Sequence, residues 1–475
     1  MDALLMSRIQ FASTAVYHYL FVPLSIGFGL VLALLVTRAY RSQDPHDDAL
    51  ATMWLRLFAG TFAVGVATGL TMEFSFGTNW ADYSRFVGDI FGAPLAAEAL
   101  LAFFMESVFL GVLIWGKKKV SPKAYMASAW IVWLGSCFSA LWIIIANSWM
   151  QTPAGYEVIQ TEAGPRAVLT DFFAAAFNAS TLERYFHVIC ALVIVGGLAA
   201  IAVAAYYMLK NRNEDLSKKL MKTGLIVAIV GCVFMAPAAH QQAVEVTEEQ
   251  PAKLAAMEGQ WESGPSEMSF FGWVDEENQV TYTIGIPGGT SFLASGSFDT
   301  VYPGLNDFDE DYYPGNVNAI YQAYHMMLYM LGVIGVVIVL ALLISLGKLR
   351  NGVTLRVLLV GWIAGLVAIE CGWLVAELGR QPWIVYGELS TADAVSGVVD
   401  PWMLVITLLL FAVIYIAIYA LWLRASFKII KKGPEAFFPG AQADPDDNED
   451  EFGEASPAAP APAADAAEDT KEAHA

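Results

Sequence analysis

Apolar residues in this chain gather into long continuous stretches instead of short alternating ones. Each stretch is long enough for about 20 residues of helix, the length that crosses the hydrocarbon core of a bilayer. Nine stretches are separated by polar loops: roughly 13–37, 52–75, 94–115, 125–148, 184–209, 220–240, 318–346, 355–378 and 401–423. The pattern predicts an all-α, multi-pass integral membrane protein with about nine transmembrane helices and a large loop between helices six and seven.

Basic residues are sorted between the two ends of these helices. Every second loop is rich in lysine and arginine: Arg38 and Arg41; Lys117, Lys118, Lys119 and Lys123; Lys210, Arg212, Lys218, Lys219 and Lys222; Lys348, Arg350 and Arg356; and Arg424, Lys428, Lys431 and Lys432. Loops rich in basic residues stay on the cytoplasmic side of a membrane. The N-terminus is therefore expected outside, the C-terminus in the cytoplasm, and the 241–317 loop outside.

Acidic residues dominate the total, with a net charge of −20, but they are concentrated in two segments. One is the external loop, 241–317, and the other is a tail, 433–475, whose Ala, Pro, Asp and Glu content predicts disorder. The remaining parts, 1–240 and 318–432, are the membrane helices. The charge gives no indication of a nucleic-acid partner. The four cysteines lie inside apolar stretches without metal-site spacing, so they are interpreted as small core residues.

Several polar side chains fall near the external ends of the helices. His18, His187, Met327 and Glu377 all lie at that level, where an ionisable group is costly and usually functional. A single membrane histidine can simply bond a neighbouring helix, and a single methionine can fill a gap in the core. Two histidines, a methionine and a glutamate at one depth instead favour haem, because His/Met pairs hold low-spin iron and a haem with one protein ligand keeps a position for O₂.

A set of local motifs carries a resemblance to a known family. The string Glu-Leu-Gly-Arg-Gln-Pro-Trp occupies 377–383, and Ala-Val-Tyr-His-Tyr-Leu-Phe-Val-Pro occupies 15–23. Further matching segments are Gly77–Trp80, Gly88–Phe91, Pro94–Glu98, Phe103–Ser107, Asn147–Gln151, Arg184–His187, Pro251–Trp261 and Tyr324–Met327. From about residue 8 to 427 the chain resembles subunit I of cytochrome bd-type quinol oxidases, of the type with a short quinol loop.

This resemblance implies three haem sites. His187 and Met327 match the ligands of a low-spin haem b, and His18 matches the ligand of one of two high-spin haems. Glu377 matches the ligand or charge partner of the second, and Arg380 is expected to neutralise haem propionates or that carboxylate. The high-spin pair is expected to be a haem b and a haem d, or a b-type haem in place of haem d. Which of the two belongs to His18 stays open. Trp373 is also expected at the cofactor.

The resemblance assigns two further groups of residues. Lys253 and Glu258, in the external loop, match positions implicated in quinol oxidation, where a base is needed because a quinol loses two protons with its two electrons. Glu98 and Glu106 match acidic residues of a proton path, with Ser139 assisting. On a regular helix these two carboxylates would point about 80° apart.

The implied function is oxidation of ubiquinol or menaquinol at the outer face and reduction of O₂ to water with cytoplasmic protons. Such a reaction is electrogenic without a pump, in the bacterial cytoplasmic (inner) membrane. The implied partners are a homologous subunit II and a small single-span subunit. Three alternatives stay open: an oxidase with only b-type haems, a proton-coupled transporter using the intramembrane glutamates, and a haem b quinol dehydrogenase that passes electrons to another protein.

Overall fold

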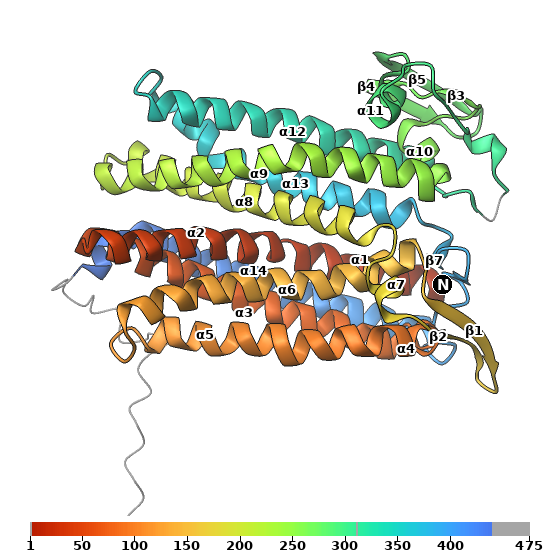
Figure 1. Ribbon diagram of the computed structural model, residues 1–475, viewed down its shortest axis with the longest axis horizontal. Helices are drawn as coiled ribbons and strands as arrows, with labels where there is room; N and C mark the ends of the chain where they lie inside the picture. The colour runs from red at the N-terminus through yellow and green to blue at the C-terminus, as the bar shows by residue number, and fades with distance from the viewer. Residues whose placement is uncertain (1, 310–311, 439–475) are drawn as a thin grey trace, which may run out of the picture.

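The computed structural model of the chain describes residues 2–309 and 312–438. Among these residues, nine helical segments are long and apolar enough to cross a membrane, and they run side by side along one axis (Figure 1). The number and order of the helices expected from hydropathy are confirmed.

The helices form two layers. One layer contains α1 Ala3–Tyr19, α2 Val22–Ser42, α3 Pro45–Thr78, α4 Ala81–Ala97, the π-helical turn η1 Glu98–Phe103, α5 Phe104–Trp115, α6 Pro122–Gln151 and α14 Pro401–Lys432. The other contains α8 Thr181–Leu209, preceded by α7 Phe172–Ala176, and α9 Glu214–Glu249, α12 Val317–Ser345 and α13 Gly352–Leu378. Figure 1 shows α8, α9, α12 and α13 above the remaining helices.

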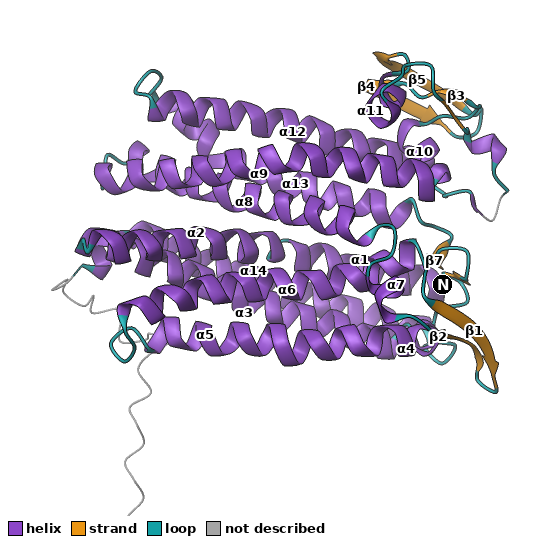
Figure 2. Cartoon of the chain, viewed as in Figure 1, coloured by secondary structure: helices purple, strands orange, loops and turns teal. Residues whose placement is uncertain are grey.

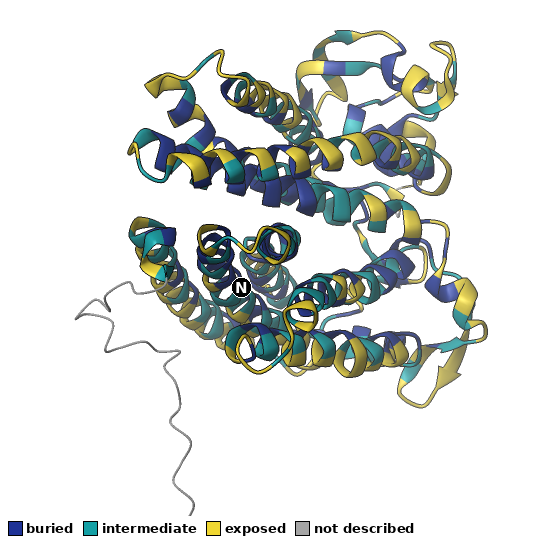
Figure 3. Ribbon diagram, turned by 60° about the vertical axis from the view of Figure 1, so that its left-hand side comes forward, coloured by how far each residue is buried: buried dark blue, intermediate teal, exposed yellow. Residues whose placement is uncertain are grey.

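Helices α2 and α8 join the two layers where two glycines meet. A Cβ atom at Gly27 would lie 2.6 Å from the Cα atom of Gly196, closer than any side chain tolerates. In a membrane, small residues let backbones approach closely and hold helices together by packing. Buried residues gather where the helices face one another, and exposed residues lie on the outer surface (Figure 3).

Several boundaries differ from the expected ones, and three of them have a clear physical reason or affect the site. The first span starts at Ala3 and contains two helices, because Pro23 fits the first turn of α2 but could not continue the hydrogen bonds of α1. The third span starts at Ala81, so Glu98 lies inside it at η1 and not at its outer end. Helix α9 continues to Glu249, past the expected start of the external loop, since a helix can extend beyond the bilayer into water.

The loops carry short secondary structure of their own. The described residues form four two-stranded antiparallel sheets: β1 Tyr156–Thr161 with β2 Gly164–Leu169, β3 Gly264–Pro265 with β6 Val301–Tyr302, β4 Met268–Asp275 with β5 Val280–Ile286, and β7 Trp383–Val385 with β8 Leu389–Ser390. The loop between α9 and α12 also contains α10 Pro251–Glu258, α11 Gly289–Ser295 and the 3-10 helix η2 Leu305–Asp307. Figure 2 shows these strands at the end of the bundle that holds the N-terminus.

The basic loops lie at the opposite end, where α2 connects to α3, α5 to α6, α8 to α9 and α12 to α13 (Figure 1). The charge sorting therefore follows the two ends of the bundle, while the side that faces the cytoplasm stays a prediction. At the C-terminus, the 3-10 helix η4 Pro434–Phe437 contacts α3. Most of the expected disordered tail, residues 439–475, lies outside the described residues.

Candidate functional site

A cavity of about 440 Å³ lies between α8, α9, α12 and α13, beneath the loop that connects α9 to α12. Cavities of about 300–1,000 Å³ are typical of cofactor and small-molecule sites. The polar, aromatic and sulfur-bearing side chains on its wall include Arg184, His187, Lys253, Thr290, Met327 and Trp373. Four of these, His187, Met327, Trp373 and Lys253, were predicted as site residues from the sequence, and the fold brings them to one cavity from four separate segments.

The wall of this cavity fits a haem with a histidine and a methionine ligand. The Nδ1 atom of His187 is buried without a hydrogen-bond partner, which is unusual for a buried imidazole. Gly372 leaves room beside the thioether, because a Cβ atom there would lie 3.3 Å from the sulfur of Met327. Of the consecutive candidates on α12, His325 bonds the carbonyl of Tyr321 and Met326 is exposed, whereas Met327 lines the cavity.

His18 is held in a tautomer that suits a metal ligand. Its Nδ1 atom lies 2.8 Å from the hydroxyl of Thr68. That hydroxyl donates a hydrogen bond to the carbonyls of Val64 and Gly65 in α3, so it accepts a hydrogen bond from the N–H group at Nδ1. The lone pair of the imidazole is then on Nε2, the form in which a histidine binds a metal while its other nitrogen is oriented by a hydrogen bond.

Glu377, at the end of α13, belongs to a chain of charged and polar contacts. Arg184 donates to the side-chain oxygen of Asn147 at 2.9 Å, and the side-chain nitrogen of Asn147 donates to Glu377 at 2.9 Å. The other carboxylate oxygen of Glu377 forms an ion pair with buried Arg380, which also donates to the carbonyl of Ile384. Of the two expected partners of Arg380, haem propionates or the Glu377 carboxylate, the structure shows Arg380 beside the carboxylate. Trp373, one turn before Glu377 on α13, packs edge-on against Tyr19, the residue after His18.

Lys253 and Glu258 are buried, although they belong to the long loop between α9 and α12. The ammonium of Lys253 donates to the side-chain oxygen of Gln151 at 2.7 Å and to that of Gln250. Burial, and then the nearby positive charge of Arg184, lower the pKa of Lys253 to about 7. Burial raises the pKa of Glu258 to about 8, although Thr290 donates to its carboxylate at 2.8 Å. Both residues can therefore exchange protons near neutral pH.

The side chains of Glu98 and Glu106 both lie against α6, although on a regular helix they were expected to point about 80° apart. Ser139 on α6 donates to Glu98 at 2.8 Å, and a Cβ atom at Gly135, one turn earlier on α6, would lie 2.8 Å from Cγ of Glu106. The π-helical turn η1 explains this, because its wider ring takes one more residue per turn than an α-helix. Eight residues then wind like about seven of a regular helix, roughly 700°, and the two side chains differ by only about 20°.

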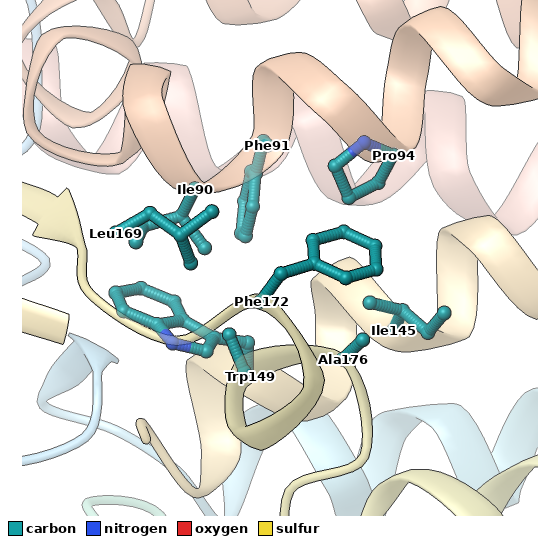
Figure 4. A pocket seen from close by; sticks show the side chains of 9 residues that line it. Ile90, Phe91, Pro94, Ile145, Trp149, Leu169, Phe172 and Ala176 are labelled. Carbon is teal, nitrogen blue, oxygen red and sulfur yellow. The ribbon is translucent and has the colours of Figure 1, made fainter. Parts of the chain in front are cut away.

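A second cavity, shown in Figure 4, is too small to hold a ligand. Its volume is about 10 Å³, and it is enclosed by apolar side chains of α4, α6, β2 and α7, among them Phe91, Trp149 and Phe172. A space of this size admits at most about one water molecule, and a water needs polar partners. This region is a packed core beneath the first hairpin.

Three residues that support the site were not singled out from the sequence as functional: Thr68, Gly135 and Asn147. Thr68 and Gly135 carry no sequence signal, because each matters only through its neighbour on another helix. Asn147 offers one signal, a carboxamide near the end of a long apolar stretch. Such a group in a membrane helix is expected to bond across helices.

In the part of the chain that the structure describes, nine membrane-length helices, an unpartnered imidazole, a thioether and the ion pair of Glu377 with buried Arg380 fit a multi-pass membrane oxidoreductase. The sequence profile described as "Cytochrome bd terminal oxidase subunit I" matches residues 6–434. The chain belongs to this family.

Individual relatives agree over nearly the full length. The chain is 36% identical to "Cytochrome bd ubiquinol oxidase subunit 1" of Bacillus subtilis (strain 168), covering 92% of this chain and 95% of the relative. It is 33% identical to "Cytochrome bd-II ubiquinol oxidase subunit 1" of Escherichia coli (strain K12), covering 92% and 98%. It is also similar to a chain of the solved bd oxidase from Geobacillus thermodenitrificans, with a TM-score of 0.83, 28% identity and coverage of 91% and 99%.

The family membership has direct consequences. The chain is subunit I of a terminal quinol oxidase, an oxidoreductase of the bacterial inner membrane that uses haem and works with a subunit II, quinol and O₂. The transporter alternative is therefore wrong. The types of haem, the residues that hold them and the source of the protons are matters for proposal.

Proposed function

We propose that this chain oxidises quinol beside Lys253 and Glu258, holds a low-spin haem b between His187 and Met327, and holds the oxygen-reducing haems near His18 and Glu377. The observation that carries the proposal is the single cavity that both iron-ligand candidates, His187 and Met327, share with Lys253. A quinol seated at the lysine would lie at the edge of that haem site. The proposed transfer therefore needs no further carrier.

Lys253 and Glu258 receive the protons of the quinol. Because its pKa is lowered to about 7, Lys253 is neutral in a large fraction of molecules at neutral pH and accepts a proton. Glu258, with a pKa raised to about 8, becomes a base as the pH increases. Gln151 and Gln250 hold the lysine amine at this position. The protons leave at the outer end of the bundle, where the loop lies.

The polar residues at the proposed haem sites orient the candidate iron ligands and balance their charge. When bound, the haems supply one-electron transfer and an iron with a free position for O₂. His18 presents its Nε2 lone pair to the iron site because Thr68 accepts a hydrogen bond from the N–H group at Nδ1. Arg380 compensates the charge of Glu377, and Asn147 fixes its orientation. The proposed set is two b-type haems and a haem d. A b-type haem in place of haem d is the alternative.

Glu106 and Glu98 move cytoplasmic protons toward the oxygen site. Both carboxylates lie along α6, and Ser139 orients Glu98 by a hydrogen bond. The protons travel inward from the cytoplasmic end, so each turnover moves charge across the membrane without a pump. Each charge moved against 100 mV stores about 2.3 kcal/mol. Subunit II and a small single-span subunit complete the enzyme.

A reduced-minus-oxidised visible spectrum of the assembled oxidase tests the haem assignment. Met327→Ala is expected to remove the low-spin b signal. The matched control Met326→Ala, at an adjacent exposed position, is expected to keep it. A low-spin signal that survives in Met327→Ala and His187→Ala would refute the ligand pair. A red-shifted band outside the b-type region establishes haem d, and its absence in an active oxidase favours the variant with only b-type haems. A haem-containing preparation that takes up no O₂ with quinol would instead indicate a quinol dehydrogenase.

A further inference from the structure

The β4–β5 hairpin of the external loop exposes a continuous apolar face. Phe271 is paired across the two strands with Ile284, and Trp273 with Tyr282. These four side chains are 59–72% exposed, which is unusual for large apolar groups that lie directly opposite one another. A soluble domain rarely leaves such a patch in water, so the face has a partner.

The hairpin runs along α12 toward the middle of the bundle. Its turn lies at the start of α12, where Asn318 accepts from the backbone of Val274. Gln322 donates to the carbonyl of Gly272 one turn further on, and Tyr329 bonds the carbonyl of Phe270 and stacks on the ring of Phe271. Tyr329 lies about 16 Å along the helix from Asn318 at 1.5 Å per residue.

From the turn of the hairpin to its open end, the exposed residues change from charged to apolar. The turn carries Glu276, Glu277 and Asn278, the middle of the hairpin carries Trp273 and Tyr282, and the open end carries Phe271 and Ile284. From water toward the hydrocarbon core, membrane proteins present charged residues first, then amphipathic aromatic residues, and then purely apolar residues.

The apolar face is also continuous with surface that must meet lipid. Beyond Tyr329, the exposed side of α12 that lies outside the cavity includes Val333, Val336 and Val339 within a membrane span. Figure 1 shows β4 and β5 beside α12, on the side away from α8. The hairpin therefore stands over the lipid next to α12 and not over the centre of the protein.

We propose that the β4–β5 hairpin lies in the membrane interface, with Phe271 and Ile284 in contact with acyl chains and Trp273 and Tyr282 at the headgroups. Its partner is the lipid bilayer itself. The contact anchors the external loop at a fixed depth against α12. This inference concerns the position of the loop and does not depend on the roles proposed for the haem and quinol residues.

Nitroxide labels on the assembled oxidase in phosphatidylcholine nanodiscs test the proposal. Cysteine variants at the exposed positions Ile284, Tyr282 and Asn278 are labelled one at a time, and wild type is labelled as background for the four native cysteines. Power saturation then compares collisions with O₂, which concentrates in lipid, and with a neutral nickel chelate, which stays in water. Quinol is left out so that no O₂ is consumed.

The ratio of O₂ to nickel collisions is expected to be highest for Ile284→Cys, intermediate for Tyr282→Cys and lowest for Asn278→Cys. Ile284 and Asn278 are on one hairpin, so a general change in the loop would move both labels together. Equal nickel access at Ile284→Cys and Asn278→Cys would place the face in water and overturn the proposal. Protection of Ile284→Cys from both reagents would overturn it too, because a protein surface and not lipid would then cover the hairpin.

Discussion

Inserting one alanine after Leu100 should disconnect the two proton-path carboxylates without touching either of them, whereas deleting Leu100 should keep them together. Leu100 lies in the π-helical turn η1 and its side chain is 73% exposed, so neither change removes core packing. With one residue fewer, the wide turn can close as a regular α-helix, and the roughly seven residues from Glu98 to Glu106 then wind by about 700°, the angle that η1 already gives them. With one residue more and the wide turn kept, the helix on one side is rotated by about 100° and shifted by about 1.5 Å relative to the other.

The size of the displacement follows from the helix radius. Side-chain atoms lie about 5 Å from the axis, so a rotation of about 100° moves the carboxylate of Glu98 by about 8 Å relative to Glu106. The 2.8 Å hydrogen bond from Ser139 cannot survive such a movement. We expect the insertion to slow re-oxidation of the reduced enzyme by O₂ at least about tenfold, as a lost acid–base step typically does.

The assay mixes the fully reduced oxidase with O₂ and follows the haem absorbance, with haem content measured in parallel. Leu100→Ala and the deletion of Leu100 serve as controls, with wild-type rates expected for both. Glu98→Gln and Glu106→Gln should be slow with normal haem content. Wild-type re-oxidation of the insertion variant beside a slow Glu98→Gln would refute the role of η1, and fast re-oxidation of both glutamine variants would refute the proton path itself.

Three other perturbations separate the remaining parts of the site. Lys253→Met should lower quinol-driven O₂ uptake at least about tenfold but leave re-oxidation of the dithionite-reduced enzyme unchanged, and an equal loss in both assays would contradict a role confined to quinol. In wild type, kcat/KM for quinol should increase with pH, because Lys253 loses its proton near pH 7 and Glu258 near pH 8, and each loss creates a base. Glu258→Gln should remove the part of the increase near pH 8 and keep the part near pH 7. Gly372→Ala places a methyl group 3.3 Å from the Met327 sulfur and should shift the low-spin haem band or its midpoint potential, whereas Gly332→Ala on α12, with nothing within 4 Å, should leave both unchanged.

The spans were predictable from the sequence because hydropathy reports directly on burial in lipid. The depth of His18, His187 and Met327 followed from the same stretches, and the family resemblance supplied their roles. The register inside a span was not predictable. Residues 94–115 are apolar on all sides, so the sequence carries no periodic signal from which the π-helical turn at Glu98 could be read.

The extramembrane parts were less accessible to sequence reasoning for a different reason. The β4–β5 strands alternate only partly, because the register shift between Ser269 and Phe271 interrupts the pattern and the face away from α12 is apolar. The burial of Lys253 was also hidden. It depends on Gln151 from α6 and on Gly379, where a Cβ atom would lie 2.6 Å from the lysine side chain.

The contact between Gly27 and Gly196 has a consequence for electron flow. On the proposed assignment, His187 and Met327 belong to one helical layer and His18 to the other, so the spacing of the layers sets the distance between their haem sites. Tunnelling rates fall exponentially with the distance between donor and acceptor. Gly27 and Gly196 hold α2 against α8, so a larger residue at either position would push the layers apart and is expected to slow the transfer.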